Sequence, residues 1–189
     1  MFYRRLIKIR IFIAIDFEKS IKSYLLHIKN KLERYFTKGR LTDIDNFHLT
    51  LQYIGELEES NIPKLLNALQ ECASKHDPFS ITLDTLGSFK KGDSNILWIG
   101  INNSEDLMRI YEELCITLKR EKIAFDEKPL KPHITLGRNI ILKKPIDELE
   151  NLISIENVII PINNITLMES KRIDGKLVNI PVATLSLKH

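Results

Sequence analysis

The sequence has little of what marks a disulfide-rich or metal-binding protein. Its two cysteines, Cys72 and Cys115, fall in predicted helices and form no C-x-x-C pair, so we expect buried thiols in a reducing compartment. It contains no H-E-x-x-H motif and no carboxylate–histidine cluster that would indicate a metal site. We therefore predict a cytoplasmic protein that uses no metal and no cofactor.

Long apolar segments are also missing. Residues 1–10 are basic and residues 11–15 are apolar, which is the order of a signal peptide, but the apolar run ends at Asp16. A secretory signal needs roughly 7–15 apolar residues and a membrane span about 20. The pattern predicts a buried strand over residues 9–15 and no membrane association.

Neither sign of charge dominates, because 28 Lys and Arg oppose 25 Asp and Glu, for a net charge of +3 and a pI near 8.8. With 43% apolar and 28% charged residues, the 189-residue chain has the composition of a soluble globular protein that can bury a core. The slight positive charge is compatible with a phosphate-bearing partner without indicating one.

Two short runs of the pattern His-x-Thr-Leu stand out, at residues 48–51 and 133–136. Each lies in a predicted strand, where side chains alternate between the two faces. Each run therefore presents an imidazole and a hydroxyl on one face and two aliphatic side chains on the other. On adjacent strands, His48, Thr50, His133 and Thr135 would surround one small anion.

Hydrophobic periodicity predicts an α+β protein. The pattern has period two in the expected strands and period three to four in the expected helices. We predict strands at about 9–15, 47–54, 79–86, 95–101, 133–138, 158–171 and 177–187, and helices at about 18–36, 60–74, 104–121, with Ser104 as its cap, and 147–153.

The order β-α-β-α-β occurs twice, and each copy carries one His-x-Thr-Leu run in its second strand. The offset of 85 residues between the runs also aligns Ile11 with Ile96 and Ile13 with Trp98. No low-complexity linker separates the copies. We expect one domain over residues 1–189, a monomer, made of two lobes at about 9–90 and 91–189 whose histidine strands face a shared groove.

Two histidines, one neutral and one protonated, can act as base and acid in one turnover. Opening of a ribose 2′,3′-cyclic phosphate needs both, because the attacking water loses a proton and the departing ribose oxygen gains one. The threonine hydroxyls can donate to the phosphate oxygens on which charge accumulates. A single run would more often be structural, but two copies at corresponding places favour a functional pair. We interpret His27, His76 and His189 as structural or exposed.

On these runs and their flanks, the sequence resembles the 2H phosphoesterase superfamily, and within it the RNA 2′,3′-cyclic phosphodiesterases, also called 2′-5′ RNA ligases. The similarity covers most of the chain, at residues 10–16, 46–56 and 131–138. It implies a bilobal fold with antiparallel sheets facing a central groove and helices outside. It also implies metal-independent hydrolysis of RNA 2′,3′-cyclic phosphate ends to 2′-phosphate ends.

By motif position, the resemblance implies that His48 and His133 are catalytic and that Thr50 and Thr135 bind phosphate. We favour His48 as the acid that protonates the 3′ oxygen and His133 as the base that activates water. The family can also work in the direction of ligation, with the two roles exchanged.

Two further residues are candidate substrate contacts. Gln52 shares the strand face of the first motif. Arg138 matches the basic residue that follows the second motif in resembling proteins, although a regular strand would place it with Leu136. A bend near Gly137 would reconcile the two.

Other groove contacts are less specific. Phe47 and Tyr53 could stack on a base, but aromatic residues in strands are more often in the core. The chain departs from the family at its C-terminal hairpin, where Leu177 and Val178 replace the usual aromatic residue after the Gly175 turn. Three basic doublets could contact an RNA backbone: Lys90-Lys91, Lys143-Lys144 and Lys171-Arg172. Such doublets more often lie in solvated loops.

Three alternatives to an RNA-end hydrolase remain open. Reversible 2′-5′ ligation could use the same site, since a catalyst accelerates both directions. A small cyclic nucleotide could be the substrate instead of RNA. A module that only binds terminal phosphates is the non-enzymatic alternative, although Lys or Arg would serve for binding alone.

Overall fold

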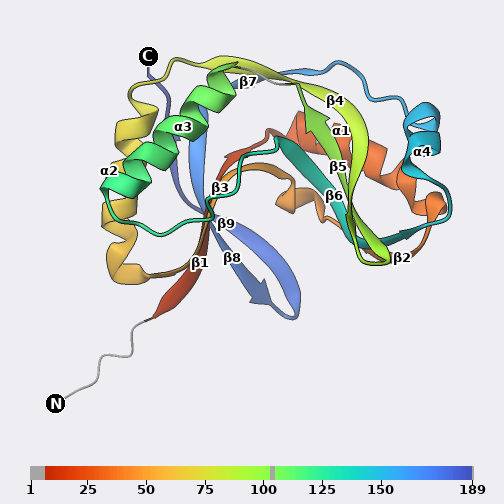
Figure 1. Cartoon of the computed structure of the whole chain (residues 1–189), viewed down its shortest axis with the longest axis horizontal. Coiled ribbons are helices and arrows are strands. Elements are labelled where there is room, and N and C mark those ends of the chain that lie inside the picture. The colour runs from red at the N-terminus through yellow and green to blue at the C-terminus, as the bar shows by residue number, and fades with distance from the viewer. Residues whose placement is uncertain (1–6, 103–104, 189) are drawn as a thin grey trace.

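The computed structural model describes residues 7–102 and 105–188 and confirms the α+β class (Figure 1). The helices are α1 Lys19–Leu32, α2 Ile62–Ala73, α3 Glu105–Arg120 and α4 Ile146–Leu152. The strands are β1 Lys8–Asp16, β2 Phe36–Leu41, β3 His48–Glu58, β4 Phe79–Lys91, β5 Ser94–Ile101, β6 His133–Leu142, β7 Ile159–Ile162, β8 Asn164–Ile173 and β9 Lys176–Ser186. Ser104, the predicted cap of α3, lies outside the described residues.

The strands pair in the order β7-β4-β5-β6-β3-β1-β8-β9, and β2 pairs with the free part of β6. Every pairing is antiparallel, as predicted. The helices α2 and α3 pack together beside β3, β8 and β9, whereas α4 packs on β4 at the other end of the sheet (Figure 1). The two histidine-bearing strands, β3 and β6, are neighbours at its centre.

The strand pairing does not follow the predicted division of the chain at residues 90 and 91. This boundary falls inside a hairpin, because β4 and β5 pair from Leu83↔Ile101 to Lys91↔Ser94 around a tight turn. Strands joined by so short a turn lie side by side. In addition, β8 pairs with β1, which brings the C-terminal hairpin to the N-terminal strand. One side of the sheet, β1, β3, β8 and β9, therefore combines segments from both halves of the sequence, and so does the other side, β4, β5, β6 and β7.

The sequence did not predict β2. The helix expected over 18–36 ends at Leu32, a 3₁₀ turn follows, and residues 36–41 form an exposed edge strand on β6. Gly39 allows this close approach: its φ is +143°, and an added Cβ would lie 2.8 Å from the Cα of Ile140. The segment has no apolar alternation, because few of its side chains are buried.

The strand expected over 158–171 is in fact two strands. The first, β7, pairs with β4, while β8 pairs with β1 at the opposite end of the sheet. The buried positions change phase at the break, from Ile160 and Ile162 in β7 to Ile165 and Leu167 in β8, with two exposed asparagines between them. The predicted strand ran across this change of phase.

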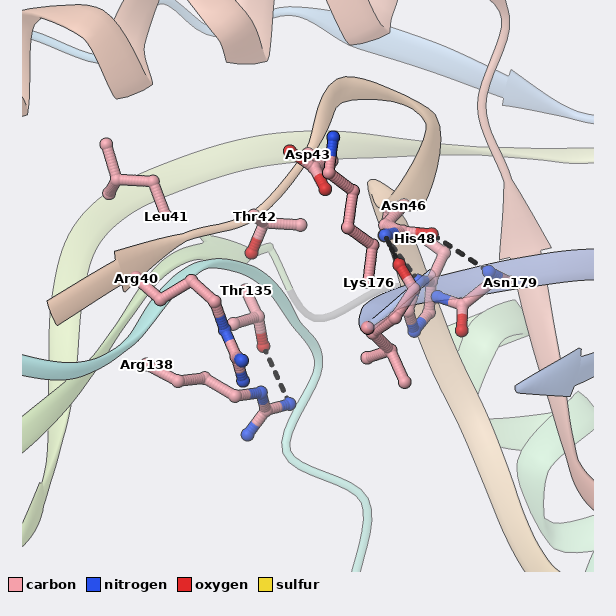
Figure 2. A pocket seen from close by; sticks show the side chains of 12 residues that line it. Arg40, Leu41, Thr42, Asp43, Asn46, His48, Thr135, Arg138, Lys176 and Asn179 are labelled. Carbon is pink, nitrogen blue, oxygen red and sulfur yellow. Dashed lines mark hydrogen bonds between the residues drawn. The ribbon is translucent and has the colours of Figure 1, made fainter. Parts of the chain in front are cut away.

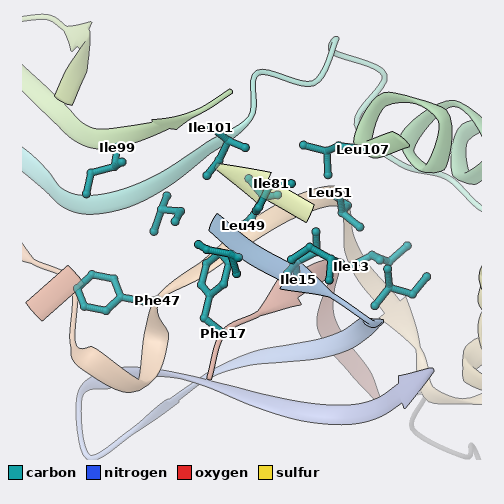
Figure 3. Close-up of a cluster of buried hydrophobic side chains, with 14 of the residues drawn as sticks. Ile13, Ile15, Phe17, Phe47, Leu49, Leu51, Ile81, Ile99, Ile101 and Leu107 are labelled. Atoms are coloured by element: carbon teal, nitrogen blue, oxygen red, sulfur yellow. The ribbon is translucent and has the colours of Figure 1, made fainter. Parts of the chain in front are cut away.

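The aliphatic half of each His-x-Thr-Leu run lies in the core, as alternation predicted. Leu49, Ile134 and Leu136 are fully buried and Leu51 is 2% exposed. Figure 3 shows Leu49 and Leu51 among other buried side chains of the core. Burial of each such side chain contributes about 1.5–3 kcal/mol, which fixes the face that each motif turns to the groove.

The thiols also lie in helices, as predicted, with Cys72 buried in α2 and Cys115 half-buried in α3. In the described ranges, no helix combines the length and the apolar character needed to cross a membrane.

Candidate active site

The two motifs meet where β3 and β6 pair, at the single rung Leu49↔Ile134. In antiparallel register, the residues on either side of this rung face each other crosswise. His48 therefore lies across from Thr135, and Thr50 lies across from His133. One pocket is lined by His48 and Thr135, and a second is lined by Thr50 and His133. The four predicted side chains thus come together around one centre.

The two imidazoles are held in the same way. The Nδ1 atom of His48 lies 2.8 Å from the carbonyl oxygen of Asn46, and that of His133 lies 2.6 Å from the carbonyl oxygen of Lys131. A carbonyl oxygen only accepts, so Nδ1 carries the proton in both rings. The lone pair of each neutral ring is then on Nε2, where His48 lies 3.1 Å from the hydroxyl of Thr50.

Burial lowers the pKa of both histidines below the usual value. For His48, the carbonyl of Asn46 and the carboxylate of Asp16 oppose this effect, while Arg138 and Lys22 add to it. For His133, the carbonyl of Lys131 opposes it and Arg138 adds to it. Both rings are therefore mostly neutral near pH 7.

Arg138 reaches the site because β6 is irregular around Gly137. The pairing with β5 shifts register on both sides of Gly137, and Asn139 has a φ of +56°. The strand therefore departs from strict alternation, as the bend expected there would require. The Arg138 guanidinium lines the pocket of His48 and donates to the Thr135 hydroxyl at 3.5 Å (Figure 2).

Gln52 lines the second pocket but is only 3% exposed. Its amide nitrogen donates to the carbonyl oxygen of Asp126 at 2.5 Å, and its amide oxygen accepts from the Cys115 thiol at 3.6 Å. Gln52 therefore ties the segment around Asp126 to β3. A direct contact between Gln52 and substrate stays a prediction.

Aromatic rings flank both histidines, and sequence reasoning missed them. The ring of Phe12 lies 4.8 Å from that of His48, and the ring of Phe89 lies 5.1 Å from that of His133. Trp98 packs against Phe89 at 5.1 Å. Alternation in β1 separates Phe12 from the core residues Ile11 and Ile13, but only the pairing of β1 with β3 brings it to the site.

The stacking candidates have different environments. Phe47 is fully buried in the core, whereas Tyr53 is 42% exposed and lines the second pocket. The predicted basic doublets line neither pocket. Arg40, on the unpredicted strand β2, does line the pocket of His48, and its only sequence signal is one cation in a polar segment.

Within the described part of the chain, no three His, Cys, Asp or Glu side chains are grouped so that they could hold a metal ion. The arrangement supports proton transfer at two imidazoles and anion binding by two hydroxyls and a guanidinium.

Comparisons with known proteins identify the family of the chain. Residues 28–173 match the family described as the 2′-5′ RNA ligase superfamily. The chain is 35% identical over 145 residues to an RNA 2′,3′-cyclic phosphodiesterase of Thermotoga maritima, covering 76% of this chain and 75% of the relative. A Methanocaldococcus jannaschii protein of the same name is 30% identical over 132 residues, covering 68% of this chain and 70% of the relative.

Solved structures share the fold. The crystal structure of Escherichia coli LigT complexed with 3′-AMP has a TM-score of 0.79 at 23% identity, covering 97% of this chain and all of that chain. A Thermus thermophilus protein has a TM-score of 0.77 at 22% identity, covering 95% of this chain and 98% of its own. With a family match over most of its length and relatives of similar extent, this chain belongs to the 2′-5′ RNA ligase superfamily.

Proposed function

We propose that this protein hydrolyses RNA 2′,3′-cyclic phosphate ends to 2′-phosphate ends. The observation that carries the proposal is the crosswise placement of two imidazoles and two hydroxyls around the β3–β6 rung, with both rings protonated on Nδ1. The name of the Thermotoga maritima relative, an RNA 2′,3′-cyclic phosphodiesterase, supports the same substrate class.

In the proposed reaction, the cyclic phosphate lies between the two histidines. A water oxygen forms a bond to phosphorus as the bond from phosphorus to O3′ breaks. His133 Nε2 takes the proton of the water, and His48, protonated on both nitrogens, gives its Nε2 proton to O3′. The hydroxyls of Thr50 and Thr135 donate to the non-bridging oxygens. Each proton transfer supplies about 10²–10⁴-fold of the rate.

The charges beside each ring support the proposed division of roles. The carboxylate of Asp16 raises the pKa of His48, which favours the protonated form that an acid needs. Among the described residues, no carboxylate contributes to the pKa of His133, whereas Arg138 lowers the pKa of both histidines. A substrate with an activated 3′ leaving group needs no acid, so it should rescue His48→Ala and not His133→Ala. Rescue of His133→Ala alone would exchange the roles.

The decisive experiment uses a short RNA with a 2′,3′-cyclic phosphate end, incubated in EDTA. Mass and phosphatase sensitivity identify the terminus, and comparison with authentic 2′- and 3′-phosphate ends identifies the isomer. His48→Ala and His133→Ala should abolish turnover. His27→Ala, which changes an exposed histidine of α1, is the matched control and should retain it.

Two outcomes would contradict the proposal. Tight binding of the cyclic end by the folded wild-type protein without turnover would indicate a binding module. A joined 2′-5′ product formed faster than the hydrolysis product, from ends with 2′,3′-cyclic phosphate and 5′-hydroxyl, would indicate a working ligase.

We also propose that the protein acts as a monomer in the cytoplasm. In support, residues of a single chain line both pockets. Light scattering at the concentration of the assay should give a mass near 22.0 kDa.

A further inference from the structure

The two pockets on either side of the histidines differ in character. The pocket beside His48 has a volume of about 190 Å³ and is lined by three cations, Arg40, Arg138 and Lys176, and by one carboxylate, that of Asp43. The pocket beside His133 is larger, about 520 Å³, and its lining combines apolar surface from Tyr53, Phe89, Pro129 and Leu130 with the charged residues Asp126, Lys128 and Lys131. A nucleotide has the same two kinds of surface, with anionic phosphates on one side and a flat apolar base on the other.

Arg40 and Arg138 are cross-strand partners in the pairing of β2 with β6. Like charges in this position repel each other. Burial lowers the pKa of Arg138, and the nearby charge of Arg40 lowers it further. In residues 7–102 and 105–188, neither guanidinium has a carboxylate within 4 Å. Figure 2 shows both guanidinium groups side by side near Thr135. Two such cations beside a hollow indicate a site for an anion.

The fold holds this pair in place. Gly39 and Gly137 lie on facing strands, and a Cβ on Gly137 would lie 3.2 Å from the carbonyl oxygen of Arg40. Because both positions lack a side chain, β2 can lie close against β6. Arg40 therefore comes from an ordered strand next to the second motif.

The opposite wall of the pocket is the start of β9, which contributes Lys176. Asn46 fixes this wall, since its amide donates to the carbonyl oxygen of Leu177 at 2.8 Å and accepts from the backbone N–H of Asn179 at 3.0 Å. The carbonyl of the same residue holds His48. The cationic pocket and the catalytic ring thus share one anchor.

We propose that the pocket of Arg40 and Lys176 binds a second phosphate, the one attached to the 5′ oxygen of the terminal ribose. This inference rests on the proposed function. One cyclic phosphate carries a single negative charge, for which Thr50, Thr135 and Arg138 already provide donors. Because the 5′ phosphate belongs to the same nucleotide as the cyclic phosphate, the proposal places it in the pocket beside His48 and the base in the pocket beside His133. The site is then built for the end of a polynucleotide rather than for a nucleoside.

The test compares three substrates of one base: a nucleoside 2′,3′-cyclic phosphate with a 5′-hydroxyl, the same with a 5′-phosphate, and a dinucleotide with a cyclic end. The wild-type kcat/KM should rise about tenfold when the 5′ phosphate or phosphodiester is present. The quantity compared between variants is the ratio of kcat/KM with the 5′ phosphate or phosphodiester to kcat/KM without it. In Arg40→Gln this ratio should fall toward one, and in Lys176→Gln it should fall to a value between one and the wild-type ratio. Arg10→Gln, which removes an exposed arginine of β1 that lines neither pocket, should keep the wild-type ratio.

Two results would overturn the inference. One is a wild-type ratio near one. The other is a loss of kcat/KM in Arg40→Gln by the same factor for all three substrates, which would place Arg40 at the cyclic phosphate. Either result still shows turnover of cyclic ends, so the proposed hydrolase function would stand. If the wild-type protein turned over none of the three substrates, the function itself would fail.

Discussion

Asp16, the last residue of β1, is the cross-strand partner of His48, the first residue of β3. Its carboxylate pairs with the Lys22 ammonium at 2.7 Å and accepts from the backbone N–H of Phe17 at 2.9 Å. Burial is the largest influence on the pKa of His48 and lowers it, whereas Asp16 raises it. Asp16 is therefore placed to keep the proposed acid partly protonated.

Asp16→Asn keeps an acceptor for the Phe17 N–H and removes the charge. The pKa of His48 should fall further, because the carboxylate that raises it is gone while Arg138 and Lys22 still lower it. An acid works only while protonated, so the alkaline limb of the pH–rate profile should move to lower pH, and kcat/KM near pH 7 should drop about threefold to tenfold. Titration of the His48 ring by NMR measures the pKa directly.

The control for this prediction is Asp147→Asn, which removes a carboxylate from the first turn of α4, outside both pockets. An unchanged alkaline limb in Asp16→Asn would show that Asp16 does not act on the acid.

The two threonine hydroxyls should act mainly in the transition state. Thr50→Val and Thr135→Val keep the shape of the side chain and remove the donor, so each should lower kcat by about 10²–10³-fold, with a smaller change in KM. Thr→Ser at the same positions keeps the donor and should recover most of the loss. If Val and Ser variants were equally slow, the methyl group rather than the hydroxyl would be the important part.

Replacing Gly39 should destabilise the fold. Gly39→Ala places a Cβ 2.8 Å from the Cα of Ile140 at a φ of +143°, so we expect a loss of about 1–3 kcal/mol in the free energy of unfolding. Gly92→Ala is the matched control: its φ is +58°, but no atom lies within 4 Å of an added Cβ. Denaturant titration should show the smaller loss, about 1 kcal/mol, for Gly92→Ala.

Asn46 should couple the C-terminal hairpin to the site. Asn46→Ala removes the hydrogen bonds to Leu177 and Asn179, so hydrogen exchange of the Asn179 amide should speed up. Asn46→Asp keeps the acceptor for Asn179 and should restore its protection. The Ala variant should also lose kcat/KM, because the segment before His48 is no longer held. If the Asn179 amide exchanged at the wild-type rate in Asn46→Ala, the hydrogen bonds between β8 and β9 would be enough to hold β9 in place.

Local pattern was enough to predict which face of each motif meets solvent. Leu49 and Ile134 are buried, and His48 and His133 face the groove, because strand alternation depends only on neighbouring residues. The bend near Gly137 was also predictable, from the conflict between that alternation and the expected role of Arg138.

Long-range pairing was not predictable in this way. The position of Phe12 beside His48 depends on β1 pairing with β3, and the position of Lys176 depends on β9 lying against β8 at the edge beyond β1. Arg40 was missed because β2 is a polar edge strand whose side chains are mostly exposed, so it carries no apolar period. The first helix was predicted too long because the helical spacing of apolar residues continues from Leu32 to Phe36, although Phe36 begins β2.

The rung between Leu49 and Ile134 has a mechanical consequence. It is the cross-strand pair through which the β1–β3–β8–β9 group meets the β4–β5–β6 group, and one histidine stands on each side of it. The distance between His48 and His133, the proposed acid and base, therefore depends on this buried contact rather than on any loop. Loops at either end of the sheet can therefore change in length without changing the distance between the two histidines, provided that Leu49 and Ile134 stay packed together.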